Sequence, residues 1–236
     1  NAEHLFDVEL GYQYTGNNWY AGTNFYYMGY KDQFVQTGEQ SDIGENLTTN
    51  VKDSYRMGAE LSAGWNATSW FTLEGNAALS INKIKDFNEF VDNWDNKKNP
   101  LKVHYDNSTL AFSPSAILNG FMNFHYKGAQ LVWHTNFVSR QYLDNSENKD
   151  RSLPAFSQSD INLSYALKTG NKQNWLKEVV FGLNFNNIFN SHYAASGWVY
   201  SAVSGKYKYT NDKRYYQIGF MPMAGFTMMG NVTLRF

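Results

Sequence analysis

The chain has 236 residues, with 20 basic and 21 acidic side chains, no cysteine, and aromatic residues at 17% of its positions. The near-neutral charge argues against a nucleic-acid-binding protein, and the lack of cysteine excludes disulfide frameworks and thiol chemistry. No run approaches the roughly 18 apolar residues that a membrane-spanning helix needs. The mean hydropathy of -0.55 remains compatible with a transmembrane β-barrel, because only alternate residues of a barrel strand face lipid.

Alternation of apolar and polar residues with a period of two predicts β-strands along most of the chain. The pattern is regular at residues 6–14, 55–66, 71–82, 179–186 and 226–236, and residues 55–66 and 71–82 form one hairpin. It is weaker at 118–126, 130–140 and 156–167, and residues 19–30 are aromatic on both faces. No segment sustains the spacing of an amphipathic helix. The sequence therefore predicts an all-β chain of about nine strands.

The connections between these strands alternate between short and long. Residues 15–18, 67–69 and 127–129 are predicted tight turns and 168–175 a modest one, whereas 33–52, 84–110, 143–155 and 190–222 are long and polar. Short turns on one rim and long loops on the other are typical of outer-membrane barrels, in which the short turns are periplasmic. This regularity favours a transmembrane antiparallel barrel over a soluble sandwich.

Proline and tryptophan positions fit the same interpretation. The long connections contain or border all 4 prolines, Pro100, Pro114, Pro154 and Pro222, where a missing backbone donor does little harm. The short turns are flanked by Trp19, Trp65, Trp70 and Trp175. An aromatic girdle at the periplasmic interface would place them there. The alternative is that these rings cap the core of a soluble hairpin.

An odd strand count predicts an incomplete barrel. Complete bacterial barrels have even counts, and an open sheet would expose unpaired backbone groups to lipid. The chain begins without Met and without a signal-like segment, which predicts a processed product or an internal fragment. We expect upstream strands to be needed for closure. The alternatives are a complete small passive porin or structural adhesin barrel, and a soluble β-sandwich with an aromatic core.

Several segments resemble the TonB-dependent outer-membrane receptors, particularly those of the Bacteroidetes type. They are LFDVELGY at residues 5–12, FYYMGYKDQF at 25–34, and FNNIFNSHY at 185–193, which is similar to the element before the final loop and strand of that family. The last strand, ending VTLRF at 232–236, is similar to the C-terminal assembly signal of outer-membrane proteins.

The resemblance implies that residues 1–236 are the C-terminal part of a 22-stranded barrel, and that the N-terminal plug domain is not in this chain. It implies active import across the bacterial outer membrane of a scarce solute such as an iron–siderophore complex, haem or cobalamin. The implied partners are membrane lipids, the remaining barrel strands, the TonB complex acting through the plug, and a surface lipoprotein.

The sequence offers no catalytic or metal-binding constellation, and we expect no enzymatic activity, cofactor or metal. The histidines lack the helical spacing of zinc sites, and no Ser-His-Asp arrangement can be argued. His125 and His134 flank the turn at 127–129 and could be neighbours in the lumen, or two separate hydrated side chains. The loop acids Asp86, Glu89, Asp92 and Asp95 could gather around calcium, but their spacing is not that of an EF-hand.

Substrate contacts are expected in the long loops, because loops on a rigid scaffold usually carry recognition. The richest set of loop aromatic and imidazole groups is Trp94, His104, Tyr105, His192, Trp198, Tyr200, Tyr207 and Tyr209. Such rings could stack on a siderophore, haem or a sugar, or they could pack loop against loop. Within the barrel, Arg56, Glu60, Glu74 and Arg140 are predicted to point into the lumen.

Overall fold

The computed structural model describes residues 1–40, 46–96, 100–169, 175–206 and 213–236. In these ranges the chain is almost entirely β-structure. The strands are β1 (His4–Thr15), β2 (Trp19–Gln40), β3 (Asn46–Thr68), β4 (Phe71–Asn93), β5 (Leu101–Thr109), β6 (Ala116–Tyr126), β7 (Ala129–Val138), β8 (Gln141–Tyr142), β9 (Ser152–Leu153), β10 (Phe156–Lys168), β11 (Glu178–Asn186), β12 (Ala194–Val203), β13 (Tyr215–Pro222) and β14 (Thr227–Arg235). A 3-10 turn spans Lys149–Arg151. None of the helical structure in the described ranges could cross a membrane.

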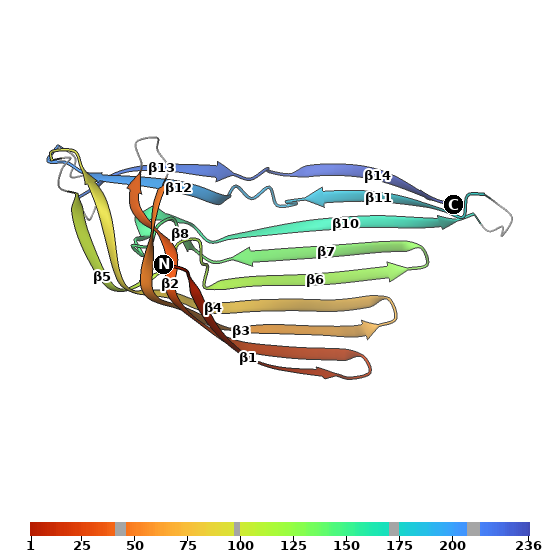
Figure 1. Cartoon of the computed structure of the whole chain (residues 1–236). Coiled ribbons are helices and arrows are strands. Elements are labelled where there is room, and N and C mark those ends of the chain that lie inside the picture. The colour runs from red at the N-terminus through yellow and green to blue at the C-terminus, as the bar shows by residue number, and fades with distance from the viewer. Residues whose placement is uncertain (41–45, 97–99, 170–174, 207–212) are drawn as a thin grey trace.

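One curved antiparallel sheet forms the body of the molecule (Figure 1), and its main path is β1-β2-β3-β4-β6-β7-β10-β11-β14. This path contains the nine predicted strands in sequential pairing, although the described ranges hold 14 strands in all. The tight turns lie at one end of the sheet and the long connections at the other. Both β1 and β14 run towards the tight-turn end, where the C-terminus lies, as the alternation of turn lengths predicts.

The long connections contain more strand than the sequence analysis expected. β5 continues the ladder of β4, and β12 pairs with β13 within residues 190–222. β2, β3 and β4 have 22, 23 and 23 residues, about twice the length that crosses a bilayer. These strands therefore extend well beyond the tight-turn half of the sheet. Pairing within the hairpins satisfies their backbone N–H and C=O groups along the extended parts.

The register gives the sheet one polar and one apolar face. Arg56 pairs with Asn82 and Glu60 with Ala78, so these side chains share one face, which also carries Glu74. Met57 pairs with Ile81 on the opposite face. The alternation predicted from the sequence is confirmed in these strands. Arg140 lies beyond the end of β7, and its Nη1 donates to Ser152 Oγ at 2.7 Å.

The apolar face is exposed to an unusual degree. On interior strands Trp65 is 49% exposed, Leu61 43% and Leu183 43%, and no second sheet covers this face anywhere in the described ranges. The soluble-sandwich alternative is therefore wrong. An uncovered apolar surface of this extent indicates contact with a nonpolar medium or partner.

Tryptophan side chains mark the tight-turn end of the sheet. Trp19 pairs with Trp65 across β2 and β3, and the ring of Trp70 lies 6.1 Å from that of Phe124. Trp175 packs on Phe236 with ring centroids 4.3 Å apart. The predicted clustering of these rings at the short turns is confirmed.

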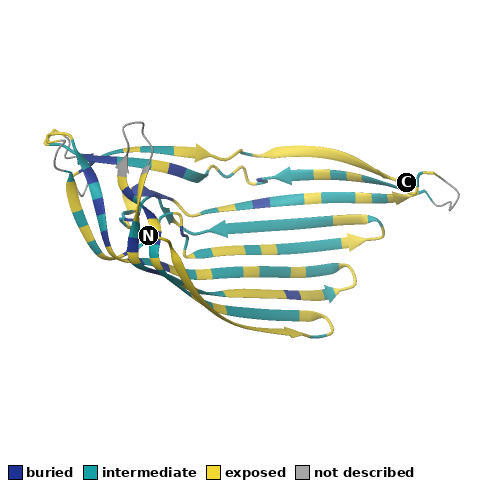
Figure 2. Ribbon diagram, in the orientation of Figure 1, coloured by how far each residue is buried: buried dark blue, intermediate teal, exposed yellow. Residues whose placement is uncertain are grey.

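Buried side chains gather at the opposite end, among the long connections (Figure 2). The main cluster comprises Val35, Val51, Ile84, Phe87 and Leu110, with Tyr105 packed against it. It lies between the extended parts of β2, β3, β4 and β5. The long-loop end is therefore a folded unit with its own core.

The two edges of the sheet stay open. In the described part of the chain β1 pairs only with β2, and β14 only with β11. The sheet does not close into a barrel by itself.

Candidate functional site

A buried ionic cluster joins three long connections at the loop end. Glu89 lies on β4, Asp144 and Arg151 on the segment between β7 and β10, and Arg214 immediately before β13. Arg214 Nη1 lies 2.8 Å and Arg151 Nη2 3.5 Å from Glu89 Oε1, and Arg151 Nε lies 2.6 Å from Asp144 Oδ2. Arg151 is fully buried, with 0% exposure. We call these four residues, with Tyr105, the loop cluster.

Tyr105 completes the loop cluster from β5. Its hydroxyl donates to Glu89 Oε2 at 2.9 Å, while Arg151 lies over the ring of Tyr216 with its guanidinium carbon 5.0 Å from the centroid. Every charge in the cluster thus has a partner of opposite sign, as buried charges require. The three segments are held together by paired charges as well as by apolar packing.

Burial alters the acid–base behaviour of the loop cluster. It raises the pKa of Tyr105 to about 12, and the charge and hydrogen bond of Glu89 add to this effect. Burial also raises the pKa of Asp144, although Arg151 opposes the shift. The Tyr105 hydroxyl therefore keeps its proton, and remains a donor to Glu89, throughout the neutral range.

An aromatic group lies beside the loop cluster at the tips of β4, β12 and β13. Trp94 Nε1 donates to Tyr200 Oη at 3.0 Å, and Tyr200 Oη donates to Asp92 Oδ2 at 2.8 Å. The rings of Trp94 and Tyr215 are 5.0 Å apart, yet Trp94 stays 39% exposed. These contacts hold Trp94 in place while its surface remains accessible.

The other predicted contact residues are spread over the loop end. His104 is partly exposed, with ring nitrogens 3.2 Å from Asn88 Oδ1 and 3.1 Å from Asp106 Oδ1. Trp198 is exposed and lies against its cross-strand partner Gly219, where a larger residue would collide with the indole. His192 is exposed in the connection before β12. Tyr207 and Tyr209 lie outside the described residues.

Trp198 also lines a cavity that reaches the loop cluster. The cavity has a volume of about 100 Å³ and includes Glu89, Asp144 and Ser201 in its walls. Ligand pockets for drug-sized molecules are usually about 300–1,000 Å³. A drug-sized solute would therefore not fit inside this cavity.

The four loop acids have separate partners at the loop end. Glu89 is paired with arginine, Asp92 accepts from Tyr200, and Asp95 accepts from Ser204 Oγ and the Gly205 amide at 3.2 and 2.6 Å. In the described ranges no group of three or more potential metal ligands converges. Glu89, Asp92 and Asp95 thus serve as acceptors that tie the loops together, and Asp86 Oδ1 lies 3.6 Å from His104 Nδ1.

His125 and His134 share the polar face but are not neighbours. The register places His125 opposite Gln130, and His134 opposite Phe121. The His134 ring stacks on Phe121 with centroids 4.4 Å apart, and its Nε2 lies 3.1 Å from Asn119 Oδ1. The suggested proximity is wrong, because a two-residue turn pairs each residue only with one equally distant from the turn.

The FNNIFNSHY segment has a structural role that the sequence analysis did not identify. Asn187 is 2% exposed and has a φ of 52°, a left-handed conformation that Asn tolerates better than most residues. Its Nδ2 donates to the carbonyls of Ser191 and Ala224 at 2.9 and 3.1 Å. Its Oδ1 accepts from the Ser191 amide at 2.8 Å. Asn187 thereby joins the end of β11 to the start of β14.

Arg151 and Arg214, the two cations of the loop cluster, were not predicted from the sequence. Each stands alone in a polar connection, and no local spacing relates either to Glu89. The sequence gives only a weak sign that these cations are buried: Leu153 lies near Arg151, and Tyr215 follows Arg214. Only the folded loops bring these residues to one place.

Comparison with known proteins gives a consistent result. The sequence model of the family described as TonB dependent receptor-like, beta-barrel, matches residues 2–188. No curated protein matches the chain by sequence.

Solved structures share the fold. The copper transporter OprC matches with a TM-score of 0.65 and 18% identity over 98% of this chain and 30% of its own. The ferric yersiniabactin uptake receptor FyuA from Yersinia pestis matches with a TM-score of 0.61 and 14% identity over 99% and 30%. The FrpB iron transporter from Neisseria meningitidis gives 0.58 and 15% over 98% and 31%. The chain thus spans about a third of the length of the structures it resembles.

Proposed function

Because this chain belongs to the TonB-dependent receptor β-barrel family of bacterial outer-membrane proteins, we propose that it is the C-terminal part of the barrel of an active importer. The solute is a scarce one, such as an iron–siderophore complex, a metal, haem or cobalamin. The observation that carries the proposal is the match of the family model to residues 2–188, together with a sheet that has one exposed apolar and one polar face.

The open edges support a place within a larger barrel. Unpaired N–H and C=O groups on β1 and β14 would be costly in hydrocarbon, so strands from elsewhere in the protein must cover them. In this proposal the barrel has about 22 strands. The nine strands of the main path in residues 1–236 are the last nine of that barrel. The plug and the TonB complex act from outside this chain, as does any surface lipoprotein. The Bacteroidetes subtype stays a prediction.

We assign substrate contact to the exposed aromatic surface at the loop end. Trp94, Trp198 and Tyr200 present rings there, and His104 and His192 add imidazole groups. Tyr105 acts indirectly in this proposal, because its hydroxyl is committed to Glu89. Tyr207 and Tyr209 remain predicted contacts.

The test is deletion of the complete gene, followed by growth with a single source of iron, haem, cobalamin or copper. We expect growth to fail on one source and to return when the intact gene is supplied. Direct binding of that solute to the purified protein should follow. Normal growth of the deletion strain on every source would reject active import of these solutes.

A further inference from the structure

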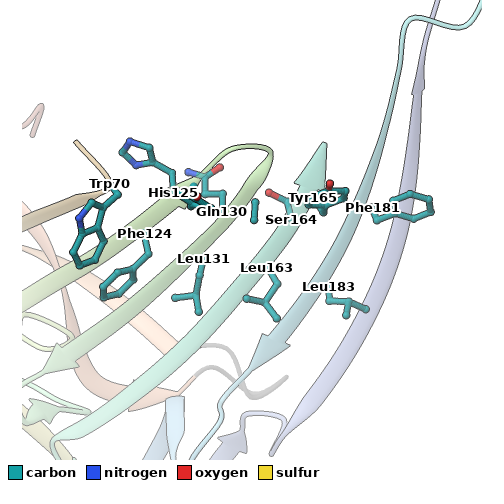
Figure 3. A pocket seen from close by; sticks show the side chains of 12 residues that line it. Trp70, Phe124, His125, Gln130, Leu131, Leu163, Ser164, Tyr165, Phe181 and Leu183 are labelled. Carbon is teal, nitrogen blue, oxygen red and sulfur yellow. The ribbon is translucent and has the colours of Figure 1, made fainter. Parts of the chain in front are cut away.

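A hollow of about 670 Å³ lies at the tight-turn end of β6, β7, β10 and β11. Figure 3 shows Leu131, Leu163 and Leu183 in a row on one side of the sheet, with Phe124 beside them. The register assigns these residues to the apolar face. His125, Gln130 and Ser164 also border the hollow but project to the opposite side (Figure 3).

The hollow exists because Ala129 is small. Ala129 pairs with Tyr126 on one side and with Tyr165 on the other, so a methyl group stands between two large rings. Leu131, Leu163 and Leu183 form the next row of the sheet and line the bottom of the hollow. The result is a depression with aromatic flanks and an aliphatic floor.

Neighbouring contacts fix the shape of this depression. The rings of Trp70 and Phe124 lie 6.1 Å apart, and those of Phe71 and Phe124 4.7 Å apart, which forms one wall. The His125 amide donates to the Trp70 carbonyl at 2.9 Å, and the Ala166 amide donates to the Gly128 carbonyl at 2.8 Å. The turn between β6 and β7 is thus held on both sides by backbone hydrogen bonds.

A positive charge stands at its mouth. Lys127 is the first residue of the turn, and its Nζ lies over the Tyr126 ring at 5.1 Å from the centroid. In barrels of this family the short turns lie at the periplasmic surface. The ammonium group is therefore at the level of phospholipid headgroups, with the apolar hollow extending from it towards the membrane interior.

We propose that this hollow is a binding site for one phospholipid of the periplasmic leaflet. An acyl chain lies on Leu131, Leu163 and Leu183 beside the Phe124 wall, and Lys127 Nζ pairs with the phosphate. The occupant follows from the surroundings: the face lies in the outer membrane, and a cation at the interface above an aliphatic floor matches the two parts of a phospholipid.

The test uses the complete receptor that contains this chain, purified in detergent, stripped of lipid and offered phosphatidylglycerol. Native mass spectrometry counts retained lipid. Ala129→Trp fills the hollow and should lower the lipid-bound fraction about tenfold. Lys127→Gln should lower it about threefold. Ala63→Trp is the matched control, because Ala63 is an exposed alanine of the same face, on β3, outside the hollow.

Each outcome is decisive. Retention in Ala129→Trp equal to that of the wild type, or equal loss in Ala63→Trp, overturns the proposal. So does competition by lipopolysaccharide, which belongs to the opposite leaflet. Heat-modifiable electrophoretic mobility verifies folding of every variant. If Ala129→Trp fails to fold, Lys127→Gln in the exposed turn decides alone, and unchanged retention there rejects the site.

Discussion

The backbone amide of Asn187 donates to the Asp160 carboxylate at 2.8 Å, which joins the end of β11 to the polar face of β10. Asp160 Oδ2 also lies 3.8 Å from His134 Nδ1 on β7, and Gln158 Nε2 donates to Asp160 Oδ1 at 2.8 Å. Three neighbouring strands therefore meet at one carboxylate. The connection from β11 to β12, the strand that carries Trp198 and Tyr200, starts from this point.

Replacing Asn187 with alanine should destabilise that connection. The variant loses side-chain bonds to Ser191 and Ala224 and leaves buried groups without partners, which costs about 2–3 kcal/mol. Limited proteolysis of the complete protein should cleave between residues 187 and 193 faster. Asn186→Ala is the control, because Asn186 makes one exposed bond, to Thr227 Oγ1 at 3.2 Å. Equal proteolysis of both variants would contradict the structural role of Asn187.

Arg151→Met should loosen three loops at once. It removes a fully buried cation and leaves Glu89 and Asp144 with fewer partners, at a cost of about 3–5 kcal/mol. Hydrogen exchange should rise together in 86–92, 143–155 and 213–218. The control Lys83→Met breaks a more exposed pair with Glu147, 2.8 Å long, and should change exchange only locally. Faster exchange confined to 143–155 in Arg151→Met would show that the loops are independent.

Trp94→Ala should weaken solute binding if the exposed rings form the contact surface. Loss of one stacking partner corresponds to roughly a tenfold increase in Kd. Isothermal titration with the solute identified by the growth assays measures the effect. Trp175→Ala serves as the control, because Trp175 is 78% exposed but belongs to the tight-turn end. An unchanged Kd in Trp94→Ala would exclude this ring from the contact surface.

Acid should release the segment at 143–148 from β4 and β5. Burial alone would raise the pKa of Glu147, but hydrogen bonds from Lys83 and Thr109 outweigh it and hold the pKa below the ordinary value of 4.5. A lowered carboxyl pKa stabilises the fold above the ordinary value, and this stabilisation is lost as the pH falls through the lowered value. Because Glu147 is 40% exposed, the contribution is about 0.5 kcal/mol.

The measurement is protection of the Thr109 amide, which donates to Glu147 Oε2 at 3.1 Å. After correction for intrinsic exchange, protection should fall below pH 4.5. Glu147→Gln should start with lower protection and show no such fall. A similar pH dependence in Glu147→Gln would assign the effect to another group.

The sequence by itself determined the strands of the main path, their faces and their direction. These features are local: a period of two assigns each side chain to a face, and turn length decides which strand pairs with which. Residues 55–66 and 71–82 were therefore placed correctly, as were the tryptophans beside the short turns. The sequence analysis placed β5 in a long loop, although Leu101, Val103 and Tyr105 alternate there with Lys102, His104 and Asp106. Three such pairs inside a long polar connection are a weak signal beside the longer alternation of the main strands.

Only the tertiary structure decided which loop residues meet. Arg214 and Glu89 are 125 positions apart, and no local pattern relates them. They meet because the folded strands bring their two loops to the same end of the sheet. The positions of the four loop acids are decided in the same way. The separation of His125 and His134 follows instead from the register of the short turn between β6 and β7. The hollow at Ala129 also depends on the exact register of β6, β7 and β10, since one small side chain opens it only when large rings stand on both sides.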